Sequence, residues 1–323
     1  MRSRRRLIAA ILVTTLCAPG TWLRTPVSWD PPAEIRVEQV QDSGETGTSG
    51  WDVAGVWQYS GESLLFGGFS ALVALPENRL IGFSDRGARF SLSEPDSESV
   101  SQAVTRQTFS ITGPDMLADV EAAARNPETG TYWLALENNH GIHRFDADHS
   151  ARGIVALNAD TLGWTNNTGA EVMARLDDGR FVILPEGRRT GLIFGSDPVA
   201  SKAYDTFAYM PPIPGHAATD MAQLPDGRVL LLLRNVDIGA GIPPFESKIA
   251  IGPPPQTGRT EPWAPEITLD LTGVIPRENY EGIAVRELAD GRVAVWLISD
   301  DNLAVIQRTL LAKLILDPKS LDD

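Results

Sequence analysis

The stretch Asn279–Asn302, NYEGIAVRELADGRVAVWLISDDN, holds a carboxylate, an apolar run, an Asp-Gly pair, a second apolar run and two further carboxylates. Asp-Gly between two apolar runs supplies the positive φ of a tight β-hairpin. The same pattern occurs upstream in four stretches that open at Phe69, Asp119, Gly169 and Thr219. A hairpin that returns about every 50 residues is typical of a β-propeller with one repeat per blade. The sequence therefore predicts an all-β propeller.

The number of blades depends on how the chain ends are used. Five copies of the repeat plus one composite blade predict six blades. The composite blade would close the ring by joining the N-terminal runs 34–40 and 53–59 to the C-terminal run 310–316. Seven blades are the alternative, if residues 240–275 contain a degenerate copy. In both cases residues 34–323 form one domain.

The N-terminus has the features of an export signal. Residues 1–18 combine four arginines, a ten-residue apolar run at 7–16 and Ala18 as a cleavage point. The apolar run is shorter than the roughly 20 residues that span a bilayer. Residues 3–7, SRRRL, also resemble a twin-arginine signal. We therefore expect a periplasmic or secreted protein, exported by the general or the twin-arginine route, with residues 19–33 as a linker. An uncleaved N-terminal membrane anchor is the alternative.

Charge restricts the classes of partner. The formal net charge is -14, and it becomes more negative once the signal is removed. Nucleic acids and anionic lipids are bound by a basic excess, so neither is expected as a partner. The only cysteine, Cys17, lies inside the signal, which leaves no thiolate metal site in the mature chain. We expect a monomer that contacts no membrane beyond its export signal.

Polar residues open the first strand of each repeat and close the second. In a propeller the first strand runs along the central channel and the second returns antiparallel to it, so both rows lie at one channel mouth. The first row is Ser70, Glu121, Glu171, Asp220 and Glu281. The second row is Asp85 with Arg86, Glu137, Glu186, Arg234, and Asp300 with Asp301 and Asn302.

A ring of carboxylates calls for a compensating charge. Like charges at close range raise each other's pKa, so the ring is filled by a cation, partly protonated or paired with arginine. Oxygen ligands favour Ca²⁺, with Mg²⁺ and Mn²⁺ as alternatives, over zinc. The predicted metal ligands are Glu121, Glu171, Asp220, Glu281 and Asp301. As an alternative, such residues bond backbone amides of the next blade.

Hydrolysis at this mouth would need acid, base and anion-holding groups. The candidate catalytic residues are Glu281, Asp300, Asp85, Arg86 and Arg234. Arg86, Arg234 and Arg308 either neutralise the carboxylates or hold an anionic substrate. His140 either contacts substrate at the same mouth or is an ordinary surface histidine. Further residues expected at the mouth are Ser70, Glu137, Glu186, Asn302 and Arg308.

A nucleophilic serine is not favoured. Gly68-Phe69-Ser70-Ala71-Leu72 lacks the last glycine and the strand-to-helix turn of a nucleophile elbow.

Several motifs together resemble a known family. FGGFSAL from Phe66, then SDRG, LALEN and LPEG, and finally NYEGIAV with LISDDN and QRTLL resemble the exported bacterial phytase-like proteins, also called the esterase-like activity of phytase family. The resemblance covers 66–316 and implies a propeller, an export signal and a metal-assisted hydrolase of esters or phosphoesters. The positions that match are Ser70, Asp85, Arg86, Glu121, Glu137, Glu171, Glu186, Asp220, Arg234, Glu281, Asp300, Asp301 and Asn302.

The function expected from these observations is that of an exported, metal-dependent hydrolase of phosphate or carboxylic esters. Its substrate would be a small or anionic ester. The first alternative is a non-catalytic propeller that binds a ligand or an envelope component and whose ion is structural. The second is a sugar-lactone hydrolase.

Overall fold

The computed structural model describes residues 29–107, 119–137, 140–164, 169–185, 187 and 189–321. The expected export signal and linker residues 19–28 therefore lie outside the described residues, as does Glu186. Within the described part of the chain, no helix is long and apolar enough to cross a membrane.

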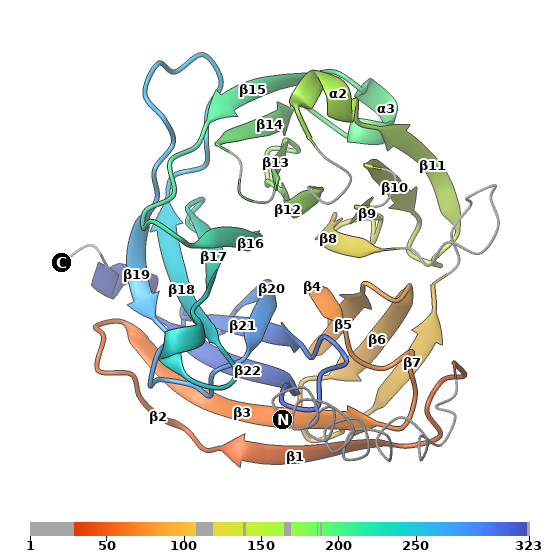
Figure 1. The fold of residues 1–323 in the computed structure, drawn as a ribbon, viewed down its shortest axis with the longest axis vertical. Coiled ribbons are helices and arrows are strands. Elements are labelled where there is room, and N and C mark those ends of the chain that lie inside the picture. The colour runs from red at the N-terminus through yellow and green to blue at the C-terminus, as the bar shows by residue number, and fades with distance from the viewer. Residues whose placement is uncertain are drawn as a thin grey trace, which may run out of the picture.

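The chain folds into a β-propeller of five antiparallel sheets around a central axis (Figure 1). Four blades each contain four strands that are consecutive in the chain. The first has β4 (Phe69–Leu75), β5 (Arg79–Ser84), β6 (Ala88–Ser93) and β7 (Gln102–Arg106). The second has β8 (Val120–Arg125), β9 (Tyr132–Leu136), β10 (Gly141–Phe145) and β11 (Ala151–Ala156). The third has β12 (Ala170–Arg175), β13 (Phe181–Pro185), β14 (Thr190–Phe194) and β15 (Tyr204–Ala208). The fourth has β16 (Ala217–Gln223), β17 (Val229–Val236), β18 (Phe245–Gly252) and β19 (Glu266–Asp270).

The fifth blade is built from both ends of the chain. Its inner strands are β20 (Asn279–Glu287), β21 (Val293–Asp300) and β22 (Thr309–Leu316). Its outer strands are β3 (Trp51–Gly61) and β1 (Ile35–Gln41), with β2 (Gly44–Glu45) paired to β3. The expected pairing of the C-terminal run with the N-terminal run is present, because β22 lies antiparallel to β3.

The predictions of six and of seven blades are wrong. The fifth copy of the repeat and the composite blade are one blade, which the six-blade count included twice. Residues 240–275 hold no further blade, because β18 and β19 are the outer strands of the fourth. The five sheets of the described residues are separate ladders, and they do not close into one hydrogen-bonded ring.

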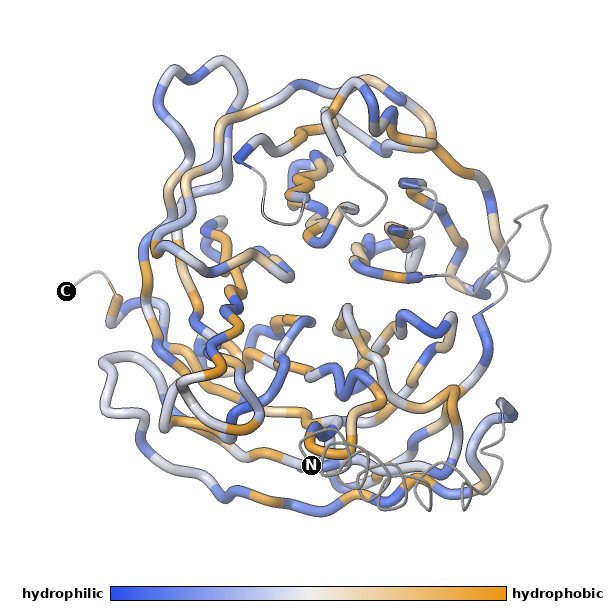
Figure 2. The backbone as a smooth tube through the Cα atoms, viewed as in Figure 1, coloured by the Kyte–Doolittle hydropathy of each residue, from blue (hydrophilic) through white to orange (hydrophobic). Residues whose placement is uncertain are grey.

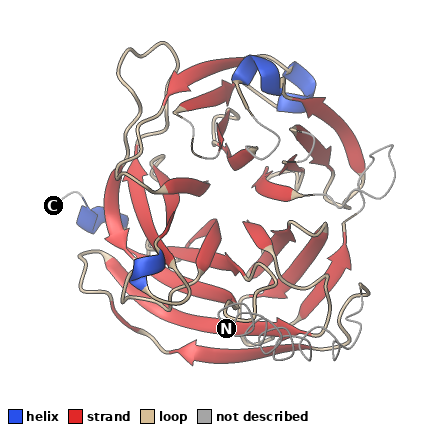
Figure 3. Cartoon of the chain, in the orientation of Figure 1, coloured by secondary structure: helices blue, strands red, loops and turns tan. Residues whose placement is uncertain are grey.

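Apolar side chains fill the spaces between neighbouring blades. The second strands are the most buried, and every residue of β21 is buried, as expected of an apolar run covered on both faces. Hydrophobic segments lie mainly in the strands (Figure 2). Helices are few and short: α2 (Ala159–Leu162), α3 (Pro198–Ser201), η1 (Ile238–Ala240) and η2 (Pro318–Leu321), all outside the inner strands (Figure 3).

One β-bulge recurs in the first strand of every blade. In the fifth blade Tyr280 pairs with Ser299 and Gly282 with Ile298, which leaves Glu281 as the extra residue. The extra residues of the other four blades are Ser70, Glu121, Glu171 and Thr219. A bulge bends the strand and re-aims the side chain, and bulges are frequent beside active sites. The side chain of the bulge residue therefore has the same orientation relative to its sheet in all five blades.

Candidate functional site

The pairing register places both predicted rows at the same end of the hairpins. Asn279 pairs with Asp300 in the fifth blade, and Ala217 pairs with Arg234 in the fourth. In the first and second blades the ladder continues past the strand ends, where the amide of Asp85 bonds the Gly68 carbonyl at 2.9 Å and that of Glu137 bonds the Asp119 carbonyl at 3.0 Å. The second row thus stands directly beside the bulge residues.

Asp220 is one position out of line with the other residues of the first row. The bulge of the fourth blade is at Thr219, and neighbouring strand residues point to opposite sides of a sheet. The Asp220 carboxylate is 2% exposed and accepts hydrogen bonds from the amides of Met221 and of Ile283 in the fifth blade, both at 2.8 Å. We therefore replace its predicted role as a metal ligand with the alternative one, a link between blades.

A signal for this shift is present in the sequence. An alanine stands three residues after the bulge in four blades, at Ala124, Ala174, Ala222 and Ala284. Aligning these alanines selects Thr219 rather than Asp220. The spacing of the repeats differs by only one residue between the two choices, so spacing alone does not separate them.

Three of the acidic residues in Asn279–Asn302, namely Glu281, Asp300 and Asp301, converge, and Asn279 hydrogen-bonds two of them. Its amide nitrogen donates to Glu281 Oε1 at 2.9 Å and to Asp300 Oδ2 at 3.3 Å. Arg234 donates to Asn279 Oδ1 at 2.7 Å and also to Glu281 Oε1. Asp301 adds to the charge around Asp300. Asn279 is thus a site residue that was not predicted, although it opens the repeat and pairs with Asp300.

Arg86 connects the first and fifth blades at this mouth. It donates to Asp301 Oδ1 at 2.9 Å and to the Phe66 carbonyl at 2.7 Å, and its Nε lies 3.6 Å from Asp85 Oδ1. The side chain is only 6% exposed. Of the two roles considered for Arg86, this geometry favours neutralisation of carboxylates over a direct hold on substrate.

Two glycines make room for these carboxylates. Gly67 and Gly68 have φ values of 99° and 65°, which side chains rarely adopt. A Cβ atom would lie 2.2 Å from Asp301 Oδ2 at Gly67 and 1.9 Å from Asp85 Oδ1 at Gly68. The Gly68 amide also donates to Asp301 Oδ1 at 3.2 Å. Only glycine allows the backbone to approach both acids so closely.

A second acidic group lies in the second blade. One carboxylate oxygen from each of Asp119, Glu121 and Glu137 lies within 4.8 Å of the others. Burial raises the pKa of Asp119, and the proximity of the two glutamates partly opposes this shift. Asp119 occupies the strand position that Asn279 occupies in the fifth blade, so the two groups have the same layout. Asp119 was not predicted as a site residue.

Electrostatic coupling joins the two groups. Burial raises the pKa of Glu281 to about 8, with Asp300 and Asp85 adding to the shift and Arg234 opposing it. Burial also raises the pKa of Asp85 to about 7, with Asp300 and Asp119 adding to it and Arg86 opposing it.

The pKa of Glu121 lies well above its ordinary value, first through burial and then through Glu171 and Glu281. Carboxylates from four blades therefore form one interacting set in which they outnumber the arginines.

The remaining predicted residues lie at the margin of this set. Ser70 is the buried bulge residue of the first blade, with its hydroxyl 3.5 Å from the Gly68 carbonyl. Asn302 is exposed, and its backbone amide donates to Asp300 Oδ1 at 2.7 Å. Arg308 donates from Nε to the buried Glu278 at 2.7 Å, so it neutralises the charge of Glu278.

His140 lies beside the second acidic group. Its backbone amide donates to the Glu137 carbonyl at 3.1 Å, and its ring meets Trp164 edge-on at 5.8 Å between centroids. Nδ1 is buried and has no hydrogen-bond partner among the described residues. The His140 ring is thus packed against Trp164, and a backbone turn connects His140 to Glu137. Glu186 lies outside the described residues.

A family model described as "Phytase-like: Esterase-like activity of phytase" matches residues 64–303. The chain belongs to this family. The match runs from just before Gly67 to just after Asp301, so it contains every carboxylate of the interacting set. A comparison with curated proteins finds no match.

Solved structures with a similar fold are distant. Hydrazine synthase of Kuenenia stuttgartiensis is 11% identical with a TM-score of 0.36, over 78% of this chain and 63% of that one. The extracellular domain of a putative hybrid two-component system of B. thetaiotaomicron is 12% identical with a TM-score of 0.38, over 77% of this chain and 28% of that one. The phytase-like chain thus spans less than two thirds of either protein, and neither likeness carries an argument about its function.

Proposed function

We propose that this phytase-like propeller is an exported, metal-dependent hydrolase of phosphate or carboxylic esters, with its site at the channel mouth. The observation that carries the proposal is the interacting set of carboxylates, above all the three oxygens of Asp119, Glu121 and Glu137 within 4.8 Å. Buried like charges at this range are strongly unfavourable unless a cation or protons compensate them.

Asp119, Glu121 and Glu137 are suited to hold a hard cation. Their carboxylate oxygens are ligands that Ca²⁺ prefers, with Mg²⁺ and Mn²⁺ as alternatives. Glu171 interacts with Glu121 and lies next to this group. When bound, such an ion polarises an ester oxygen and lowers the pKa of a neighbouring water molecule. Asp220 is left out of this ligand set because backbone amides occupy its oxygens.

Glu281 and Asp85 are suited to proton transfer. Their pKa values, about 8 and about 7, lie close to neutral pH, where a general acid or base works best. Asn279 and Arg234 hold the Glu281 carboxylate in place, and Arg234 brings the positive charge nearest to it. In this proposal Glu281 exchanges a proton with the ester or with water.

Activity assays with a defined metal test the proposal. The purified protein, freed of metal and then supplied with Ca²⁺, Mg²⁺ or Mn²⁺, is expected to hydrolyse members of a phosphomonoester panel or of a short-chain acyl ester panel. Glu121→Gln is expected to reduce both metal binding and turnover. Inactivity on both panels with all three ions would overturn the proposal.

A non-catalytic propeller is the second candidate, and one observation favours it. Arg86 with Asp301, and Asp220 with Ile283, link neighbouring blades, so some acids at this mouth have structural duties. Glu281→Gln separates the candidates. Loss of turnover at an unchanged melting temperature supports the enzyme, whereas a large fall in melting temperature without any activity to lose supports the binding protein.

A further inference from the structure

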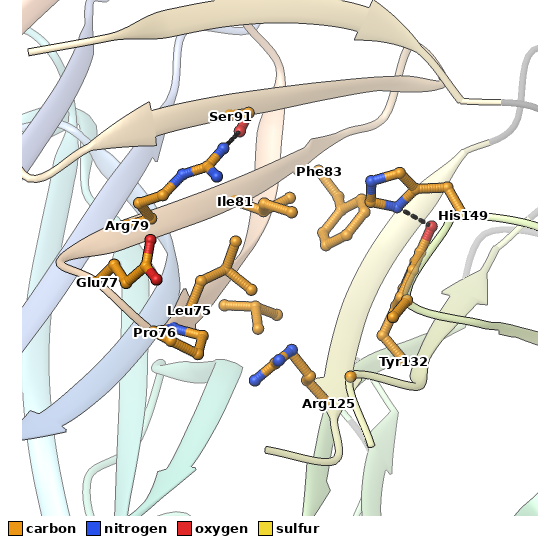
Figure 4. A pocket seen from close by; sticks show the side chains of 13 residues that line it. Leu75, Pro76, Glu77, Arg79, Ile81, Phe83, Ser91, Arg125, Tyr132 and His149 are labelled. Atoms are coloured by element: carbon orange, nitrogen blue, oxygen red, sulfur yellow. Dashed lines mark hydrogen bonds between the residues drawn. The ribbon is translucent and has the colours of Figure 1, made fainter. Parts of the chain in front are cut away.

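A pocket of about 370 Å³ opens between the first and second blades (Figure 4). Its rim consists of turns that join strands at the end of the blades opposite the channel mouth. Pro76 and Glu77 follow β4, Gly130 precedes β9, and Ala147 and His149 lie between β10 and β11. The pocket is therefore separate from the carboxylates described above.

The pocket exists because the apolar filling between these two blades is sparse. Of the five apolar clusters between blades in the described chain, the one here has the fewest buried residues. Its members Val73, Ile81 and Phe83 also line the pocket. The floor is thus an apolar surface that belongs to the core, of which Val73 and Ile81 remain 9% and 8% exposed.

Positive charge flanks this apolar floor. Figure 4 shows the side chains of Leu75 and Ile81 between Arg79 and Arg125, with Phe83 beside Ile81 on the side of His149. Arg79 donates to Ser91 at 3.0 Å, whereas the guanidinium of Arg125, whose backbone pairs with Tyr132, has no hydrogen-bond or ion-pair partner within the described residues. A guanidinium without an acid partner is unusual in a chain with a net charge of -14.

The other polar groups of the pocket leave this charge available. Glu77 is its only lining carboxylate. His149 Nδ1 lies 3.1 Å from the Tyr132 hydroxyl, and burial lowers the pKa of His149, so its ring is neutral at pH 7. Burial also lowers the pKa of Arg125, because water is partly excluded from its charge.

We propose that this pocket binds a small organic carboxylate with an apolar body, such as an aromatic or short aliphatic acid. Its carboxylate would meet Arg125, since a guanidinium matches a carboxylate through two parallel hydrogen bonds, and Arg79 would add positive charge from the other side of the floor. Its body would lie on Val73, Ile81 and Phe83. The volume is in the range of small-molecule pockets, and Glu77 disfavours ligands with several negative charges.

Calorimetric titration of the full chain with simple probes tests the proposal. Benzoate and hexanoate are expected to bind saturably with one site per chain. Benzamide has the body without the charge, and inorganic phosphate has charge without the body, so both are expected to bind at least about tenfold more weakly.

Two variants locate the binding. Arg125→Gln is expected to weaken benzoate binding by about tenfold to a hundredfold, the loss of one charged hydrogen-bond donor. Arg175→Gln is the matched control, because Arg175 ends the first strand of the next blade. Arg125 and Arg175 both line the hollow where the channel meets this face, but only Arg125 lines the pocket. The control is therefore expected to bind benzoate as the wild type does.

Several outcomes would overturn the proposal. They are the absence of saturable carboxylate binding, equal binding of benzamide and benzoate, and equal losses in the two arginine variants. If Arg125→Gln fails to fold, Arg79→Gln replaces it in the same comparison. Hydrolase activity at the channel mouth does not enter these measurements, so either proposal can fail without the other.

Discussion

Asp220→Asn tests the register that the bulges define. In the folded chain both oxygens of this carboxylate accept backbone amide protons at 2.8 Å, one of them from Ile283 of the next blade. Asparagine keeps one acceptor and turns an NH₂ group toward the other amide. One buried N–H is then left unsatisfied, which costs about 1–3 kcal/mol.

For a domain of this size that cost corresponds to a fall in melting temperature of about 2–5 °C. Calorimetric scans of metal-free protein measure it, and Glu287→Gln on the exposed end of β20 serves as a control for the loss of one acid. Calcium affinity, measured by titration, is expected to stay within about twofold of the wild type. If Asp220→Asn instead loses calcium and keeps its melting temperature, Asp220 is a metal ligand and the assignment by bulges is refuted.

Three further predictions concern the mouth itself. Gly67→Ala places a Cβ atom 2.2 Å from Asp301 Oδ2, so we expect a loss of about 1–3 kcal/mol in urea unfolding. Burial raises the folded-state pKa of Glu281 to about 8 and of Asp85 to about 7, above the 4.5 and 3.8 of the unfolded chain. The metal-free folded state then holds more protons, so its free energy of unfolding should fall as pH rises from about 5 to 8, and calcium should flatten this dependence. Asp119→Asn should weaken calcium binding by about tenfold or more without lowering the metal-free melting temperature.

Each of these predictions has a contrary outcome. Wild-type stability of Gly67→Ala would mean that Asp301 is free to move away from the glycine. Stability that rises between pH 5 and 8 without metal would mean that the buried acids are ionised and compensated. Unchanged calcium affinity in Asp119→Asn would remove the second blade from the metal site.

The hairpins and the mouth can be predicted from the sequence because their signals are local. Asp-Gly turns and apolar runs mark each repeat, and the polar residues at strand ends follow from the antiparallel return of the second strand. The blade number depends on long-range pairing instead. Only one strand, β22, follows the last hairpin, so that repeat gains its fourth strand only by recruiting β3 from the N-terminus, to which β1 and β2 then add.

Side-chain direction at the strand starts is harder to predict. A bulge inserts one residue and reverses the alternation of side chains from that point. The position of the bulge therefore decides whether Thr219 or Asp220 takes the place of the bulge acids in the other blades, although the apolar pattern changes little. Spacing does not reveal this, whereas the alanine three residues after the bulge in four of the five blades does. The glycines at Gly67 and Gly68 are visible in the sequence, but only the approach of Asp301 and Asp85 explains them.

In the proposed function, the second and fifth blades have different roles at one mouth, the second holding a cation and the fifth donating a proton. Both blades have an acid on the bulge and an acid at the end of the second strand. They differ in the residue two positions before the bulge, which lies opposite the end of the second strand. In the fifth blade that residue is Asn279, which satisfies Glu281 together with Arg234 and leaves little need for a metal. In the second blade it is Asp119, which adds a third carboxylate instead of a donor. A cation is therefore favoured at the second blade and a titrating carboxyl group at the fifth, and the coulombic effect of Glu281 on Glu121 connects the two across the channel.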